Sequence, residues 1–438
     1  MAFSSLRPLT SRNFALVWSS ALVSNVGSWV QTVALGTLVT LDQHNPFWTA
    51  VVMAAGFLPM GLMAPIGGVL ADRFDRRRWL MVTTVAESAF AFLLAALVAG
   101  GHRSPIFLVV LAFVGSSAGS IGFPAYQALL PDLVEQDDLM AAVSLSSAQW
   151  NMGRVLGPAI AGVILVTWSP ALAFALNGAS FGAVVIALWF VRVPTHVRAP
   201  SGEKMWARLR EGAAAAAREP GCRAAILLIS VLALLAAPFI GLIASLAIDG
   251  LHHQAGGPAT LTTAQGIGAV VGALSLAPLA TRIGHRRVVA VAMISVGVAL
   301  VLYGLAPNLV LAAVAIALVG GTYICVLSGL NTVVQLRAPE AARGRILSLF
   351  MVSLGVLYPI GLMIQGEVAR VIGVRVMTIL SGLMLLVAIA AIAIFSPRTF
   401  EALDTGAHRG VPDASVSEAA EFDPAAGLDL EDLDREHP

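Results

Sequence analysis

Charged residues are scarce in this sequence, and cysteine is almost absent. Only 12% of the 438 residues are Asp, Glu, Lys or Arg, whereas 58% are hydrophobic and the mean hydropathy is +0.85. A water-soluble globular chain carries about twice that share of charge and cannot bury so much apolar surface. The two cysteines, Cys222 and Cys325, lie far apart in or beside apolar runs. This spacing suggests neither a disulfide framework nor a cysteine metal site, and it favours a role as small apolar side chains.

Other shortages exclude further classes of protein. Lys204 is the only lysine, and no Gly-x-x-x-x-Gly-Lys loop is present to cradle nucleotide phosphates, so the chain is not its own ATPase of that type. No cluster of His, Asp and Glu has metal-ligand spacing, and His252 and His253 form an isolated pair. We therefore expect no enzyme activity, no metal, no cofactor and no nucleic-acid partner.

Long apolar runs, by contrast, are abundant. Twelve of them are each long enough to cross a hydrocarbon core of about 30 Å, for which roughly 20 helical residues suffice. The runs must be helices, because lipid cannot satisfy the backbone of an open structure. The predicted fold class is all-α, a polytopic membrane protein with twelve transmembrane helices. The predicted spans are 14–41, 47–71, 79–99, 105–130, 139–167, 170–191, 223–249, 259–281, 288–306, 308–336, 345–369 and 372–395.

Basic residues lie mostly on one side of these spans. Twenty of them fall in segments on the side of the N-terminus, and only Arg103, Arg370 and Arg375 fall on the other side. The positive-inside rule then places both termini in the cytoplasm. We expect a monomeric, multi-pass protein of the cell membrane.

The longest internal break divides the chain into six spans plus six. Ser201 can cap a short helix that ends before Pro220, and this helix suits either the cytoplasmic membrane surface or a solvated linker. The C-terminal segment holds 11 of the 25 acidic residues, which predicts a disordered cytoplasmic extension or a docking segment for a partner. The predicted divisions are an N-terminal bundle (1–191), a cytoplasmic linker (192–222), a C-terminal bundle (223–396) and an acidic tail (397–438).

An internal repeat relates the two halves. Residues 68–78, between the second and third spans, align without gaps with residues 277–287, between the eighth and ninth, at an offset of 209. A duplicated six-helix unit with its axis along the membrane normal is a recurrent transporter architecture. The sequence therefore predicts two pseudo-symmetric six-helix bundles. A second, weaker echo relates Ser144, Gly157 and Gly162 of the fifth span to Ser348, Gly361 and Gly366 of the eleventh.

These features resemble the major facilitator superfamily. The first repeated loop matches its cytoplasmic motif of glycine, Asp-Arg and an arginine pair, and the fifth span matches its antiporter motif around a Gly-Pro step. Residues 122–134 and 151–158 look like the branch that contains the enterobactin exporter and macrolide efflux proteins. The matching residues are Gly68, Asp72, Arg73, Arg76 and Arg77 in the loop and Gly153, Gly157, Pro158, Ala161 and Gly162 in the span.

The resemblance covers residues 8–396 and implies a function. It implies a secondary-active exporter of small amphiphilic molecules, drug-like or siderophore-like, that works by alternating access and is driven by the proton gradient. The fourth span lacks the arginine, and the first span lacks the central acid, that many drug:proton antiporters carry, so proton coupling rests on the resemblance alone. The alternatives are an importer or facilitator of a small metabolite and a non-transporting sensor or scaffold with the same fold.

In this family the loop is implied to latch the two halves together at the cytoplasmic face when the protein opens outward. An acid at position 72 is not what the positive-inside rule favours, so we assign Asp72 to the latch. Simple topology is enough to explain Arg76 to Arg78. The predicted gate residues are Gly68, Asp72, Arg73, Arg76 and Arg77, with Arg282 and Arg286 in the repeated loop.

Two charged residues lie clearly inside predicted spans, and each is a functional candidate because an intramembrane charge is expensive. Glu87 lies about 12–13 Å along the third span, where a carboxyl group could carry protons. The alternative is a structural role, because the third helix is peripheral in this family. Arg154 cannot release its proton, so it could hold an anionic substrate group, pair with a carboxylate or serve the structure.

The family fold also implies that the first, fourth, seventh and tenth helices line a central cavity. Mixed aromatic and amide walls suit a bulky, partly apolar ligand. The candidate lining residues are Asn25, Trp29, Gln31, Tyr126, Gln127, Tyr323 and Asn331.

Overall fold

The computed structural model describes residues 4–191, 205–254 and 256–404. Within these ranges the chain is helical and contains no strand, as the apolar runs predict. The elements in chain order are η1 (Ser4–Thr10), α1 (Arg12–Gln43), α2 (Pro46–Leu62), α3 (Ala64–Arg73), α4 (Arg76–Ala99), α5 (Pro105–Leu129), η2 (Leu130–Leu133), η3 (Gln136–Asp138), α6 (Leu139–Thr167), α7 (Pro170–Phe190), α8 (Met205–Arg218), α9 (Pro220–Val231), η4 (Leu232–Ala236), α10 (Phe239–Ser245), η5 (Leu246–Gly250), α11 (Gly256–Ile283), α12 (His285–Leu305), α13 (Leu309–Arg337), η6 (Glu340–Ala342), α14 (Arg343–Ile372), α15 (Val374–Phe395) and α16 (Arg398–Glu401).

Eleven of the described helical segments are long and apolar enough to cross a membrane, and the twelfth predicted crossing is a broken helix. The predicted span 47–71 is divided at Met63 into α2 and α3. Pro59 and Pro65 explain the break because both lack a backbone N–H, and Pro65 stands in the first turn of α3, where no donor is needed. The seventh crossing is also irregular, because the π-helical turns η4 and η5 flank α10.

Capping side chains set where two helices of the N-terminal half begin. Asn45 accepts a hydrogen bond from the backbone N–H of Phe47 at 3.1 Å, which starts α2. In the first repeated loop, Asp75 accepts one from the backbone N–H of Arg78 at 2.8 Å, which starts α4. Each cap satisfies a donor that a helix leaves unpaired at its N-terminus. The helix can therefore begin directly after a short connection.

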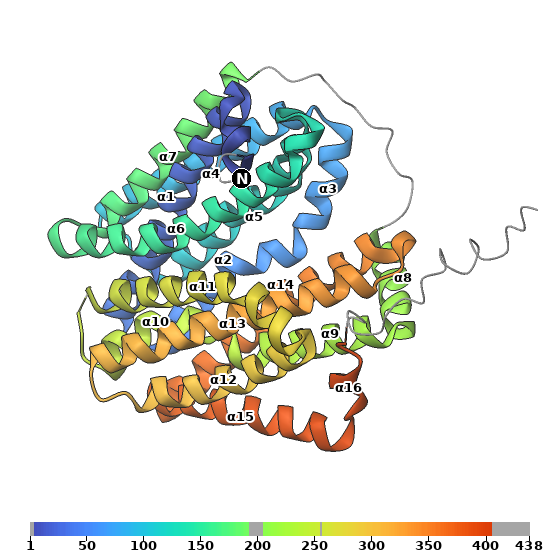
Figure 1. The fold of residues 1–438 in the computed structure, drawn as a ribbon. Helices are drawn as coiled ribbons and strands as arrows, with labels where there is room; N and C mark the ends of the chain where they lie inside the picture. The colour runs from blue at the N-terminus through green and yellow to red at the C-terminus, as the bar shows by residue number, and fades with distance from the viewer. Residues whose placement is uncertain (1–3, 192–204, 255, 405–438) are drawn as a thin grey trace, which may run out of the picture.

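The helices form two bundles that meet along two seams. The N-terminal bundle comprises α1–α7 and the C-terminal bundle comprises α9–α15 (Figure 1). One seam is α2 against α14, and the other is α6 against α11. Figure 1 shows the bundles side by side where α2, α11 and α14 meet, and separating toward α3 and α8. The bundles are therefore closed at one end of the molecule and apart at the other, which we call the closed end and the separated end.

Close contacts at the two seams reveal the symmetry between the bundles. A Cβ placed on Gly162 of α6 would lie 2.8 Å from the Cβ of Ala259 on α11, and one placed on Gly366 of α14 would overlap the Cβ of Ala50 on α2. The two glycines are 204 residues apart, and the two alanines are 209 residues apart, which is the offset of the repeated loop. The seams are therefore equivalent, each built from a glycine and an alanine at matching positions.

The same relation holds inside each bundle. A Cβ on Gly157 of α6 would lie 2.9 Å from the carbonyl oxygen of Val26 on α1, and one on Gly361 of α14 would overlap the carbonyl oxygen of Leu234 in the seventh crossing. Gly157 and Gly361 are again 204 residues apart. The prediction of two pseudo-symmetric bundles is confirmed.

The segment between the bundles ends in α8, which packs against α14. Glu211 forms an ion pair with Arg345 at 2.9 Å, and Glu219 caps the following helix, α9. The helix is thus attached to the C-terminal bundle. Ser201, the predicted cap, and the rest of residues 192–204 lie outside the described residues.

The first eight residues of the predicted acidic tail belong to the C-terminal bundle. Phe400 and Leu403 are buried, and the backbone carbonyl of Asp404 accepts a hydrogen bond from Arg337 at 3.2 Å. The two apolar side chains explain why residues 397–404 pack on the bundle. Residues 405–438 lie outside the described residues.

Candidate functional site

The arginine pair of the first repeated loop binds within the N-terminal bundle. Arg76 donates hydrogen bonds to the carbonyl of Ala128 at 2.9 Å and to the carboxylate of Asp132 at 3.0 Å. Arg77 donates to two backbone carbonyls at the last turn of α7, at 2.6 and 3.0 Å. Cations stabilise the unpaired carbonyls at helix C-termini. Both arginines therefore hold α4 to its neighbours, whereas Gly68 has no atom within 4 Å of the position of a Cβ.

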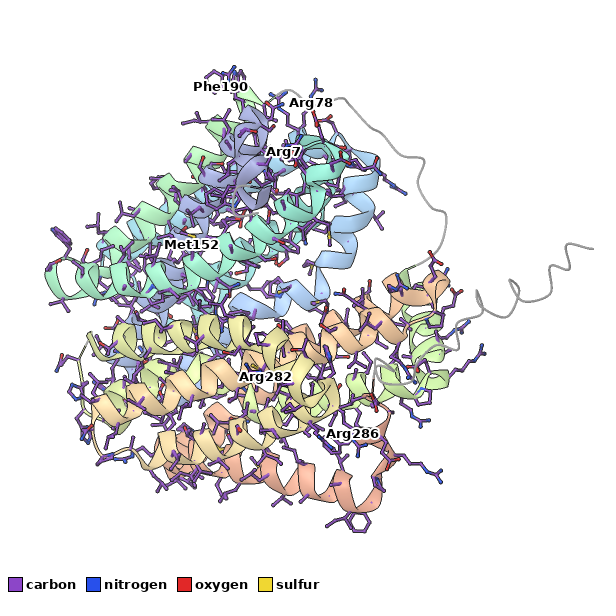
Figure 2. The ribbon with its side chains drawn as sticks, viewed as in Figure 1. Arg7, Arg78, Met152, Phe190, Arg282 and Arg286 are labelled. Carbon is purple, nitrogen blue, oxygen red and sulfur yellow. The ribbon has the colours of Figure 1, made fainter. Side chains whose placement is uncertain are left out.

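The other predicted gate residues lie at the separated end. Figure 2 shows Arg78 of the first loop on one bundle and Arg286 of the second loop on the other, well apart in the view. Arg73, Arg282 and Arg286 are exposed. The backbone of Asp72 belongs to α3, and its side chain lies outside the described part of the structure. A latch at Asp72 stays a prediction for the state in which this end closes.

The glycines of the predicted antiporter motif lie where α6 packs closely against α1 and α11. A Cβ on Gly153 would lie 2.9 Å from the Cβ of Asn25 on α1, the helix that Gly157 also contacts. Gly162 contacts α11 of the opposite bundle. Small residues let helix backbones approach closely in a membrane. The motif therefore joins α6 both to its own bundle and to the seam.

Arg154 lies between these contacts, near the middle of α6. The carbon at the centre of its guanidinium is 5.7 Å from the ring centroid of Trp29, a cation–π contact. A Cβ on Gly266 of α11 would lie 2.8 Å from the carbonyl oxygen of Arg154, so the residue is at the seam. Its Nε is sealed from solvent, and it has no acceptor among the described residues.

Aromatic rings extend this site into the opposite bundle. Tyr323 of α13 lies within electrostatic range of the guanidinium and edge-on to Phe239, with 5.8 Å between ring centroids. Tyr358 of α14 lies within range of Tyr323 and edge-on to Phe57 of α2, with 5.2 Å between centroids. Six crossings of the two bundles thus contribute side chains to one group. This central cluster consists of Trp29, Phe57, Arg154, Phe239, Tyr323 and Tyr358.

Sequence reasoning found half of the central cluster and missed the other half. It singled out Trp29, Arg154 and Tyr323, and it did not find Phe57, Phe239 or Tyr358. One signal was present, because Tyr358 follows Arg154 by 204 residues, the offset that relates Gly157 to Gly361. The two residues therefore hold equivalent positions on α6 and α14.

Two predicted lining residues make hydrogen bonds inside the N-terminal bundle. The side-chain oxygen of Gln31 accepts a hydrogen bond from Asn177 of α7 at 2.9 Å, and the hydroxyl of Tyr126 donates to Gln149 of α6 at 3.4 Å. These polar groups are thus paired with helices of their own bundle. The remaining predicted lining residues, which are partly or fully exposed, are Asn25, Gln127 and Asn331.

Glu87 lies between α4 and α5, inside the N-terminal bundle. A Cβ on Gly119 of α5 would overlap a carboxylate oxygen of Glu87, and one on Gly122 would overlap the hydroxyl of Thr83. The carboxyl of Glu87 packs against α5 and forms no ion pair among the described residues. An intramembrane carboxyl without a cation is a candidate for function.

A hydrogen bond between two side chains joins the bundles at the closed end. Nδ1 of His44, directly after α1, lies 3.0 Å from Oδ1 of Asp249 in η5. Within the N-terminal bundle, Asp42 pairs with Arg103 at 3.5 Å. The contact between His44 and Asp249 spans the two bundles, so it must break if this end opens.

Two known proteins that are similar to this chain are named as efflux proteins. The chain is 25% identical over 394 residues to "Multidrug efflux pump Tap" of Mycolicibacterium fortuitum, covering 88% of this chain and 96% of that protein. It is 24% identical over 384 residues to "Macrolide efflux protein A" of Streptococcus pyogenes, covering 85% and 93%.

A solved structure shows the same fold. The crystal structure of a bacterial homologue of the human lysosomal transporter Spinster, inward-facing and unoccupied, matches with a TM-score of 0.69 at 15% identity, covering 90% of this chain and 98% of that one. The sequence profile of the transmembrane secretion effector family matches residues 3–428, which confirms the resemblance seen in the motifs. The chain therefore belongs to this family of major facilitator transporters, which are not enzymes.

Proposed function

We propose that the protein exports small amphiphilic molecules by proton-coupled antiport. The observation that carries this proposal is the central cluster, which combines a cation with aromatic rings from both bundles. A site shared by two bundles that are closed at one end and apart at the other suits alternating access. The efflux activities named for the two relatives support export as the direction.

The proposed orientation follows from the arginines. If the arginine-rich side is cytoplasmic, both termini are cytoplasmic and the bundles separate toward the cytoplasm. The two seams and the pair of His44 with Asp249 then close the outer side. In this state a molecule from the cytoplasm or the inner leaflet can approach the central cluster.

Glu87 is the proposed proton-carrying group. The other acidic residues of the described spans lie near helix ends, whereas Glu87 lies in the middle of α4. Its carboxylate is pressed against Gly119 of α5, so a change in its charge acts directly on the packing of α4 against α5. Uptake and release of one proton there would couple the gradient to the N-terminal bundle.

The test is transport into inverted membrane vesicles whose interior is made acidic. A panel of ethidium, erythromycin and naphthoate is offered, with and without an uncoupler. We expect uptake of at least one compound, in amounts that depend on the protein, and loss of this uptake when the uncoupler is added. Vesicles that contain the protein and take up no compound, or take up compounds equally with the uncoupler, would contradict proton-coupled export.

Two matched variants test the coupling residue. Glu87→Gln keeps the shape of the side chain but cannot ionise, so uptake should lose its dependence on the pH gradient. Glu367→Gln is the control, because Glu367 is an exposed residue paired with Arg370 three positions later. An unchanged pH profile in Glu87→Gln removes Glu87 as the proton carrier.

A further inference from the structure

Arg154 is a cation whose charge the described part of the chain leaves without a counter-ion. No described carboxylate forms an ion pair with it, and its Nε has no acceptor. Two acids of the described helical segments pair with other residues instead, Asp132 with Arg76 and Asp249 with His44. The Trp29 ring lies against the guanidinium, and a cation–π contact leaves the N–H donors in the guanidinium plane free.

The symmetry of the fold places a second unpaired donor opposite this cation. Tyr358 holds on α14 the position that Arg154 holds on α6, and its buried hydroxyl has no hydrogen-bond partner among the described residues. Each residue contacts a helix of the opposite bundle, Arg154 at Gly266 of α11 and Tyr358 at Phe57 of α2. The two contacts are equivalent, because Phe57 and Gly266 are separated by 209 residues, the offset of the repeated loop. Tyr323 lies within electrostatic range of both. The pseudo-twofold therefore relates a cation on one bundle to a phenol on the other.

These two donors call for an acceptor that the described residues do not supply. A charge inside a membrane is expensive unless it is paired, and a guanidinium presents parallel N–H groups that match the two oxygens of a carboxylate. A ring contacts each donor, Trp29 at Arg154 and Phe57 at Tyr358, so the rest of the bound molecule must be apolar or aromatic. A small inorganic anion would neutralise the charge and leave the aromatic walls without a partner.

We propose that the central cluster binds an amphiphile that carries an anionic group, a carboxylate on an aromatic or apolar body. The carboxylate accepts from Arg154 on the N-terminal bundle and from the hydroxyl of Tyr358 on the C-terminal bundle, and the body lies against Trp29 and Phe57. The inference rests on the proposed function, and it names the substrate class of the same site. A molecule bound in this way contacts both bundles, so its arrival and departure are coupled to their separation.

The test measures binding to the purified full-length protein in a non-ionic detergent. Three probes share one ring system: naphthoate, its methyl ester and naphthylmethylammonium. We expect naphthoate to raise the thermal unfolding midpoint in a saturable manner, and the ester and the ammonium to have little effect. Equal shifts with the ester or the ammonium would overturn the inference. If chloride, at the same ionic strength, raised the thermal unfolding midpoint as much as naphthoate does, the inference would also be overturned, because the site would then hold an inorganic anion.

Variants assign the effect to the side chain. Arg154→Gln should abolish the naphthoate shift, and Arg154→Lys should weaken naphthoate at least about tenfold, because lysine keeps the charge but lacks the planar fork. Arg370→Gln, the same change at an exposed arginine, should bind as the wild type does. If Arg154→Gln does not fold, the lysine variant and the three probes still decide whether Arg154 binds the carboxylate. Full binding by Arg154→Lys contradicts the bidentate contact, and full binding by Arg154→Gln contradicts the site.

This assay requires no transport, so its failure is distinct from failure of the proposed function. A protein that binds naphthoate selectively but moves nothing in vesicles would contradict export and leave the anionic site standing. A protein that exports ethidium but does not distinguish naphthoate from its ester would contradict only the anionic site.

Discussion

A single methyl group at the seam between α2 and α14 should shift the protein out of the observed conformation. A Cβ added to Gly355 would lie 2.7 Å from the Cα of Gly61 on α2, just before that helix breaks at Met63. The neighbour is backbone and cannot rotate away, so the helices must separate by about 1 Å to reach ordinary contact. Overpacking of this kind costs about 1–3 kcal/mol. Because the contact closes the seam, Gly355→Ala should move the equilibrium away from the observed state by about 5- to 150-fold.

The measurement is the distance between spin labels on Arg73→Cys and Arg286→Cys, two exposed positions at the separated ends of the bundles. Cys222 and Cys325 are first replaced by alanine. We expect a shorter distance in Gly355→Ala, because this end closes as the seam opens. Gly344→Ala is the control on the same helix, since a Cβ there meets no atom within 4 Å. A wild-type distance distribution in a folded Gly355→Ala would refute the reasoning.

Three further predictions concern side chains at the two ends of the molecule. His44→Ala removes a partly exposed pair worth less than about 1 kcal/mol, so it should change the ratio of the two spin-label distance populations by at most about fivefold. The same change at His102, an exposed histidine, should leave that ratio unchanged. Arg77→Gln loses charge-assisted bonds to the end of α7, so the midpoint of thermal unfolding should fall by an amount equivalent to about 1–3 kcal/mol, whereas Arg78→Gln should leave it unchanged. Asp72→Asn should abolish export in vesicles while the amount of protein in the membrane stays the same, and full export would contradict the latch.

The repeat could be predicted from the sequence because it is written in matching residue types at fixed offsets. The offset of 209 between the loops reappears in Ala50 and Ala259 at the seams, and the offset of 204 reappears in Gly162 and Gly366. The sequence did not show which helices these residues touch. Small residues predict that a helix approaches a neighbour closely, but they do not say which neighbour.

The hydrogen bonds of the loop arginines could not be predicted. Arg76 binds a carbonyl 52 residues away, and Arg77 binds one 111 residues away. These two acceptors are backbone carbonyls at helix ends, which every helix possesses, so no residue type marks them, although Arg76 also binds the carboxylate of Asp132. The sequence therefore suggested that these arginines set the membrane topology or form a gate. The structure shows that they bind carbonyls within the N-terminal bundle.

Composition and the length of the apolar runs determined that this chain is a helical membrane protein, and the repeated loop determined that it has two related bundles. Lipid leaves the backbone no other means of satisfying its hydrogen bonds, so these properties depend on local sequence. Only the tertiary structure decided that Trp29, Arg154 and Tyr358 belong to one site and that Arg154 meets no carboxylate of the described residues there. Those facts depend on how helices from distant parts of the chain pack against one another, because a charge is paired or unpaired only through its neighbours in space.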